Sequence, residues 1–168
     1  RLKTEFRPTQ DEDEYSHLTQ LMLQEVHRLN SIVEQFLSLS RPLKIKREEL
    51  QLQDMLKELA ALEEGNAKQL KTRIRVVVSP DLPLLKADRE YLRQTLLNLI
   101  LNGLQAMPDG GTLTLEANTS NGNMLITVTD TGVGISPENL TRIFEPYFTT
   151  KAKGSGLGLV IARRIVEA

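Results

Sequence analysis

Three glycines at alternate positions, Gly154, Gly156 and Gly158, precede the apolar segment VIARRIVEA, which has the pattern of a helix. Glycine adopts positive φ readily and leaves the backbone N–H groups accessible, and the first N–H groups of a helix lack intrahelical partners and carry positive partial charge. The combination predicts a loop that binds phosphate. A flexible loop before a helix has the same composition, so the glycines alone leave both interpretations open.

Four amide side chains recur at spacings of four, four and three on the helix predicted for residues 88–107. Side chains with this spacing lie on one face of a helix. Mg²⁺ accepts neutral carbonyl oxygens beside water and phosphate oxygens, so we expect this face to bind a hard cation. The alternative is a weakly polar stripe that faces solvent. The four residues are Gln94, Asn98, Asn102 and Gln105.

A single carboxylate, Asp130, ends a predicted strand and is followed by Gly132 and Gly134. A carboxylate beside bare backbone can accept a hydrogen bond from an exocyclic amine while a flat ring lies against the glycines. The same string also fits an ordinary turn, so its function depends on what lies around it.

Three cations lie between this string and the glycine loop, and they could neutralise a polyphosphate or keep a surface loop soluble. The nearest carboxylate before Lys151 is Glu145, six residues earlier. We therefore expect Lys151 and its neighbour Lys153 to lack local ion-pair partners and to bind an anion. The cations are Arg142, Lys151 and Lys153.

The composition excludes several classes of protein. A chain of 168 residues that is 40% hydrophobic can bury a core as one domain, or as a small domain with an appended element. The net charge of −1 argues against a nucleic-acid-binding protein, because such domains are usually strongly basic. The absence of cysteine excludes disulfides and thiolate metal sites, and the two histidines are not part of a recognisable triad with acidic residues, which argues against zinc. No apolar run approaches the roughly 18 residues of a membrane span.

Before Pro42, apolar residues recur at spacings of four and three, as in the a/d seam of a helix that packs on other helices. Leu21, Ile32 and Leu37 widen the stripe, which favours a four-helix bundle over a two-stranded coil. Packing of this helix on its own domain is the alternative. The seam consists of Leu18, Met22, Val26, Leu29, Val33 and Phe36.

From Leu43 onward the pattern is mixed α and β. We predict a helix over 54–70, a strand over 73–80 and a helix that Asp88 caps. Two strands joined by the Asn-Gly pair in SNGN follow, then a short helix after Ser136 and the final helix. Helices on one face of a largely antiparallel sheet make an α+β fold, a two-layer α/β sandwich.

Taken together, four motifs resemble those of sensor histidine kinases, members of the GHKL ATPase superfamily shared with gyrase B, Hsp90 and MutL. NLILN resembles the asparagine box, DTGVGI the first glycine box, FEPYF the phenylalanine box and GSGLGL the second glycine box. The segment EVHRLNSIVEQFLSLSRP is similar to the second helix of the dimerisation and histidine-phosphotransfer hairpin. The sequences of these motifs most resemble those of the nitrogen-regulation type of kinase.

This resemblance implies a partial hairpin at residues 1–43 and a Bergerat-type ATP-binding domain at 44–168, truncated at its C-terminus. It implies that Asn102 coordinates Mg²⁺, that Asn98 lies beside the phosphates and that Asp130 hydrogen-bonds the adenine amino group. Residues 136–155 would form a mobile lid that nucleotide orders. The residues implied to catalyse are Asn98, Arg142 and Lys151. Those implied to bind ATP are Asn98, Asn102, Asp130, Gly132, Gly134, Gly154, Gly156, Leu157 and Gly158.

The resemblance also implies the reaction and its partners. The γ-phosphoryl of Mg-ATP would move to a histidine, and then to an aspartate of a response-regulator receiver domain. The kinase would be a homodimer through the helical hairpin, would not bind nucleic acid, and would be cytoplasmic or the cytoplasmic portion of a membrane-anchored sensor.

The histidine box of the family is absent, and this departure leaves two alternatives open. Of the two histidines, His17 and His27, the latter is followed by Arg28 rather than by an acidic residue that could act as a base, so we expect the acceptor histidine to lie outside this chain. Gyrase-like hydrolysis is one alternative, but it would require a glutamate in the place of Asn98. The other is a module that binds ATP or a partner without phosphotransfer.

Overall fold

The chain divides into two compact units, residues 1–42 and residues 43–168. The computed structural model describes residues 12–40, 43–151 and 154–168. In the first unit the described element is the helix α2 (Glu12–Ser40), which carries the predicted seam and ends before Pro42. In the described ranges, no helix combines the length and the apolar character needed to cross a membrane.

The predicted seam of α2 is exposed to solvent in the single chain. Its described members are between 47% and 65% exposed, which leaves a continuous apolar face on one helix. The side chains of Ile32, Phe36 and His27 lie outside the described residues, whereas that of His17 is exposed. The described seam residues are Leu18, Met22, Val26, Leu29 and Val33.

The second unit contains helices and strands in mixed order, and most of them begin and end within a few residues of the prediction. The short strands β1 and β3 are additional, and they pair antiparallel with each other. The elements are β1 (Glu48–Leu50), α3 (Leu52–Gln69), β2 (Thr72–Val78), β3 (Leu85–Ala87), α4 (Arg89–Gln105), β4 (Gly111–Ser120), β5 (Asn123–Asp130), α5 (Pro137–Leu140) and α6 (Gly158–Val166).

The larger sheet has the strand order β2-β4-β5. The hairpin β4–β5 is antiparallel and turns at Asn121 and Gly122, whose φ values of 53° and 78° suit a type I′ turn, so the predicted hairpin is confirmed. The expectation of a largely antiparallel sheet is wrong for the other pair, because β2 and β4 are parallel. The connection between them contains α4, and such a crossover returns the chain to the end of the sheet where it started.

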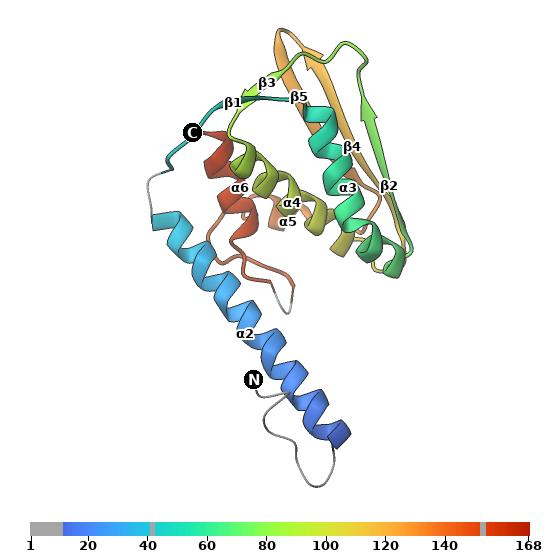
Figure 1. The fold of residues 1–168 in the computed structure, drawn as a ribbon, viewed down its shortest axis with the longest axis vertical. Coiled ribbons are helices and arrows are strands. Elements are labelled where there is room, and N and C mark those ends of the chain that lie inside the picture. Colours follow the sequence, from blue (N-terminus) through green and yellow to red (C-terminus); the bar gives the residue numbers. More distant parts are fainter. Residues whose placement is uncertain (1–11, 41–42, 152–153) are drawn as a thin grey trace. The chain divides into compact units, whose positions relative to one another are not determined.

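The helices α3 and α4 pack on one face of this sheet, as Figure 1 shows. The opposite face carries the exposed Arg73 and Arg75 of β2, so the predicted two-layer α/β sandwich is confirmed. Apolar side chains from both layers fill the space between them. Deeply buried members of this core include Leu52, Leu56 and Leu59 of α3, Leu96, Ile100 and Leu104 of α4, and Leu113 and Leu115 of β4.

Asp88 fixes the start of α4. Its Oδ1 accepts hydrogen bonds from the backbone N–H groups of Glu90 and Tyr91, each at 3.1 Å, as an N-cap residue does. Its Oδ2 accepts from the N–H of Lys46 at 2.7 Å, which ties the segment before β1 to this helix. The bond from Lys46, aided by those from the helix, lowers the pKa of Asp88 below its usual value.

We expect Asp88→Ala to lower the free energy of unfolding by about 1–2 kcal/mol at neutral pH, because the N-cap and the bond to Lys46 are both lost. Since the folded-state pKa of Asp88 is lowered, this stabilisation is complete above the ordinary aspartate pKa of about 4 and declines as the pH falls through the folded value. Urea unfolding from pH 7 to pH 3 measures it.

The matched control is Asp81→Ala, because Asp81 is exposed and does not cap a helix. The difference between the two variants should shrink toward pH 3. Equal losses of stability in both variants at pH 7 would contradict the role of Asp88.

Candidate functional site

The amide face of α4 contacts the final helix. The Nδ2 group of Asn98 donates to the carbonyl oxygen of Gly158, the first residue of α6, at 3.4 Å. The residue preceding α6, Leu157, is fully buried, as are Ile161 and Ala162 within it. The predicted asparagine and second glycine motifs therefore lie against each other, with the start of α6 beside Asn98.

Lys151 also lies against this face. Its Nζ donates to Oδ1 of Asn102 and to Oε1 of Gln105, each at 2.7 Å. The residue as a whole is exposed, but its ammonium end is partly buried, and this desolvation lowers the pKa of Lys151. Lys151 thus makes no ion pair with Glu145, as expected, but it does have partners, which are neutral amide oxygens from a distant helix. Lys153 lies outside the described residues.

The backbone around Lys151 forms a compact turn. The N–H of Lys151 donates to Oγ1 of Thr149 at 3.1 Å, and the N–H of Gly154 donates to the carbonyl oxygen of Lys151 at 3.1 Å. A Cβ on Gly154 would clash with Oγ1 of Thr149, so a side chain at this position would displace the threonine. No sequence pattern identified Thr149, whose hydroxyl accepts from the backbone N–H of the lysine.

Gly156 has a φ of +68°, as a glycine loop allows. A Cβ at this position would clash with the backbone of Tyr147 and would lie 2.8 Å from the N of Phe148. Tyr147 itself has a φ of +67°, which is rare for a bulky residue. In this structure Gly156 thus makes room for the chain's own backbone, in a segment that is locally strained.

Asp130 lies at the end of β5, where its Oδ1 accepts a hydrogen bond from the N–H of Gly132 at 2.9 Å. A Cβ on Gly132 would clash with the carbonyl oxygen of Ala106, so the absent side chain lets this turn pack against the end of α4. The next N–H, that of Val133, donates to the same carbonyl oxygen at 3.0 Å. The first glycine motif is therefore fixed to the helix that carries the amides.

Exposed apolar surface lies beside this carboxylate. Val133 is 83% exposed and Ile135 is 51% exposed, and Gly134, with a φ of +70°, has open space where a side chain would be. Apolar side chains next to a carboxylate can bind a flat, partly polar ring.

Arg142 makes its contacts within its own segment. Its Nε lies 3.1 Å from Oε2 of Glu145, and its guanidinium lies 4.3 Å from the centre of the Phe148 ring. Arg163 of α6 lies over the ring of Phe144 at 5.5 Å. The structure thus brings Lys151 to the amide face, whereas the contacts of Arg142 are with Glu145 and Phe148.

A cation at this face would depend on neutral oxygens. Among the residues that the structure describes, no group of three or more histidine and carboxylate side chains could hold a metal ion. Two amide oxygens of α4 already accept hydrogen bonds from a cation, the ammonium of Lys151. These oxygens fit Mg²⁺ that is bound mainly by the phosphate of a ligand and by water.

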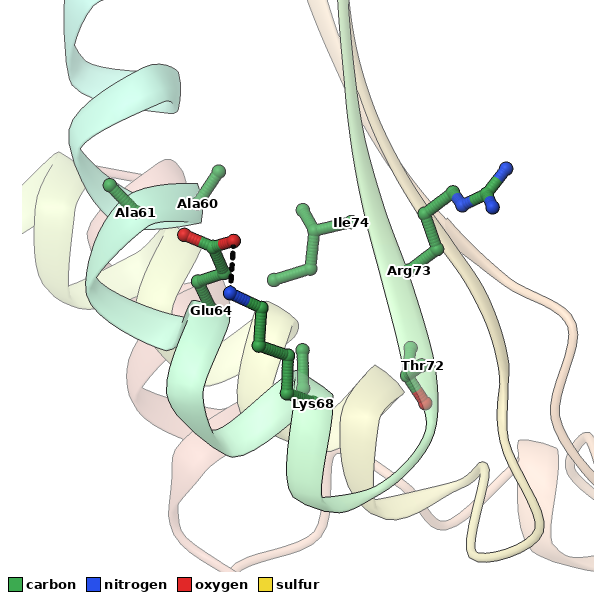
Figure 2. A pocket seen from close by; sticks show the side chains of 8 residues that line it. Ala60, Ala61, Glu64, Lys68, Thr72, Arg73 and Ile74 are labelled. Atoms are coloured by element: carbon green, nitrogen blue, oxygen red, sulfur yellow. Dashed lines mark ion pairs between the residues drawn. The ribbon is translucent and has the colours of Figure 1, made fainter.

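A pocket of about 470 Å³ lies elsewhere, between α3 and β2. Figure 2 shows that the ion pair between Glu64 and Lys68, 2.7 Å long, lies within it. None of the predicted site residues lines this pocket, and two of its three charged side chains, Glu64 and Lys68, pair with each other along α3. Its lining is Ala60, Ala61, Glu64, Ala67, Lys68, Thr72, Arg73 and Ile74.

Residues 87–168 match the family of histidine kinase-, DNA gyrase B- and HSP90-like ATPases. Sensor histidine kinase ZraS of Escherichia coli (strain K12) is 38% identical over 154 residues, which is 92% of this chain and 33% of ZraS. Sporulation kinase D of Bacillus subtilis (strain 168) is 40% identical over 145 residues, 85% of this chain and 28% of that kinase. The chain thus spans about a third of the length of the curated relatives that it matches.

Solved structures of histidine kinases have the same fold. Full-length ShkA in complex with AMPPNP matches with a TM-score of 0.84 at 29% identity, over 99% of this chain and 36% of ShkA. Histidine kinase ThkA in complex with the response regulator TrrA matches with a TM-score of 0.75 at 25% identity, over 99% of this chain and 47% of that one. Residues 87–168 are thus similar to the histidine kinase-, DNA gyrase B- and HSP90-like ATPase family, and the relatives that the chain resembles include the sensor histidine kinase ZraS.

Proposed function

We propose that this chain is the ATP-binding part of a two-component sensor histidine kinase. The whole enzyme moves the γ-phosphoryl of Mg-ATP to a histidine outside this chain and then to an aspartate of a response-regulator receiver domain. One observation carries the proposal: Asn102 of α4 and Lys151 of the segment before α6 meet through a hydrogen bond of 2.7 Å. An amide oxygen suited to Mg²⁺ and a cation suited to phosphate thus lie side by side.

The residues around this contact supply binding and charge. Asn102 holds Mg²⁺, which when bound offsets the negative charge of the phosphates. Asn98 lies beside the start of α6, where unpaired N–H groups and the helix dipole favour phosphate. Lys151 moves its positive charge from the amides to the γ-phosphate, and Arg142 is a second cation of the same segment.

The adenine side of the site is the turn after β5. Asp130 accepts a hydrogen bond from the adenine amino group, and the ring lies on the exposed apolar surface of Val133 and Ile135. Gly134 keeps this surface free of a further side chain, and Gly132 lets the turn pack against the end of α4. The second glycine motif, residues 154–158, contacts the phosphates.

Amide chemistry argues against hydrolysis as the main reaction. The carboxamide of Asn98 has no proton-accepting group near neutral pH, so it cannot activate water as a carboxylate would. The binding module without phosphotransfer makes a different prediction from the kinase. It would bind Mg-ATP, yet it would label neither a histidine of the full-length protein nor a receiver domain.

The whole kinase is a dimer of a helical hairpin joined to a catalytic domain. Residues 1–43 form part of the dimerisation hairpin and residues 44–168 the catalytic domain, in a cytoplasmic protein or the cytoplasmic part of a larger one. The partners are a second copy of the chain and a receiver domain, which the complex of ThkA with a response regulator supports. The sequences of the four motifs favour a kinase of the nitrogen-regulation type.

We expect Asn102→Ala to abolish the dependence of ATP binding on Mg²⁺ while the fold remains intact. The side chain is half-buried and its hydrogen bond is to Lys151, so its loss opens no core cavity. ATP titrations with and without Mg²⁺ should show at least about a tenfold loss of affinity, and only when Mg²⁺ is present. Gln53→Ala, an exposed amide change on α3, is the control, and an unchanged Mg²⁺ effect in Asn102→Ala would refute the metal assignment.

We expect Asp130→Asn to bind ATP roughly tenfold to a hundredfold more weakly and to discriminate less between ATP and GTP. The asparagine Oδ1 can still accept from the N–H of Gly132, so the turn is kept, whereas its amide group can turn a donor toward the adenine amine. Competition titrations with both nucleotides measure the change. With Asp109→Asn as an exposed control, equal ATP affinity in all three proteins would exclude the adenine contact.

We expect the full-length protein to be a homodimer, with the seam of α2 in a four-helix bundle formed by two hairpins around a two-fold axis. Val26 is 61% exposed, and Val26→Glu should place charge in the bundle and shift the protein to monomer in sedimentation at micromolar concentration. Gln20→Glu, on an exposed position outside the seam, should leave the dimer intact. A wild-type monomer under these conditions would contradict the proposal.

A further inference from the structure

We propose that Asn102 and Gln105 form a two-oxygen seat for a cation, and that the ammonium of Lys151 fills this seat until nucleotide arrives. We call these three residues the latch. The inference rests on the proposed function, because it makes Lys151 a competitor of the cation that Asn102 binds. It assigns a positioning role to Gln105, a residue outside the four kinase motifs.

The geometry of the latch is that of a cation site. Asn102 and Gln105 are three residues apart on α4, so their side chains leave the helix on the same face. Both oxygens accept from the same Nζ atom at 2.7 Å, which is short for an N–H donor and typical of a charged one. A lysine ammonium has three donors and no acceptor, so two of its three hydrogen bonds are made by the latch.

The neighbouring charges explain why amides hold this lysine. Glu145, the nearest carboxylate before it in sequence, pairs with Arg142 at 3.1 Å. The ammonium is therefore offset by neutral dipoles rather than by a full negative charge, and such partners attract it less than a carboxylate would. A polyphosphate can consequently displace them.

The backbone holds the lysine ready for this exchange. Thr149 Oγ1 accepts from the N–H of Lys151, and the carbonyl oxygen of Lys151 accepts from the N–H of Gly154. When nucleotide binds, Lys151 gains phosphate oxygens and Asn102 loses the ammonium, whereas Gln105 is left without its partner. Gln105 thus stabilises only the nucleotide-free arrangement. The larger the fraction of molecules in which the latch is formed, the lower is the apparent affinity for Mg-ATP.

The direct test is hydrogen exchange of the backbone amides of residues 147–151 without nucleotide. We expect Gln105→Met, which keeps the length of the side chain and removes the acceptor, to speed this exchange roughly threefold to tenfold. Gln105→Glu, which adds a charge to the acceptor, should slow it. Gln53→Met on the exposed face of α3 is the matched control and should behave as wild type.

A second variant separates the latch from a general loosening of α4. In a Lys151→Met background the ammonium is gone, so adding Gln105→Met should not speed the exchange further. In titrations with Mg-ATP, Gln105→Met should bind about threefold to tenfold more tightly than wild type and Gln105→Glu more weakly, since the first removes the competing state and the second strengthens it.

The outcomes distinguish the latch from the proposed function. If wild type binds Mg-ATP but Gln105→Met exchanges no faster than Gln53→Met, the latch is wrong and the ATP site stands. The latch would also be wrong if Gln105→Met speeded the exchange equally in wild type and in the Lys151→Met background. If wild type shows no binding of Mg-ATP, the proposed function fails, and so does the competition for Asn102. Faster exchange in Gln105→Met would then show only that Gln105 contacts Lys151.

Discussion

The burial of one face of α4 is the constraint on which the candidate site depends. Leu96, Ile100 and Leu104 are inaccessible or nearly so in the core between α4 and the sheet, so the rotation of the helix about its axis is determined. The amides Asn98 and Asn102 must then project from another face, toward the segment before α6 and its first residue. A change that rotated α4 would therefore misplace the metal ligand even if every polar residue were kept.

Close backbone approach supports the same arrangement from the adenine side. Gly103 is buried in α4, and a Cβ there would clash with Leu113 and approach the Cβ of Asp130 to 3.4 Å. Gly132 makes the complementary approach, from the turn after β5 to Ala106 at the end of the helix. Two glycines on opposite sides of one contact thus set the distance between the carboxylate and the amides, and alanine at either position would force them apart.

Much of this arrangement could be predicted from the sequence, because it follows from local patterns. The cap at Asp88, the Asn-Gly hairpin and the amide spacing on α4 each depend on neighbouring residues, and all of them appear in the structure. The strands β1 and β3 could not be predicted, since three residues are too few to show alternation. The parallel pairing of β2 and β4 could not be predicted either, because the order of the elements along the chain does not say which strands are neighbours in the sheet.

The partners of Lys151 were missed for a similar reason. A search for opposite charge nearby in sequence finds Glu145, which pairs with Arg142 instead. The real partners are neutral side chains 46 and 49 residues away, and only the packed position of α4 brings them within reach. Sequence patterns identify a donor and its acceptors separately, whereas their meeting is a property of the tertiary fold.

In the segment from Tyr147 to Lys151, the hydrogen bonds of a lysine oppose the cost of a strained backbone. A bulky residue at a φ of +67° costs about 1–2 kcal/mol, which Tyr147 can sustain only while its surroundings hold it there. The two hydrogen bonds of the Lys151 ammonium to amides contribute roughly 1.5–3 kcal/mol each before the cost of burying part of the charge is subtracted. Since the strain and the partial burial of the charge both oppose these bonds, a ligand that offers Lys151 a stronger partner can release the strained turn. A lysine held by amides therefore keeps this segment in place and can still be released by a ligand. A buried ion pair at the same place would hold the lysine more strongly and oppose its release.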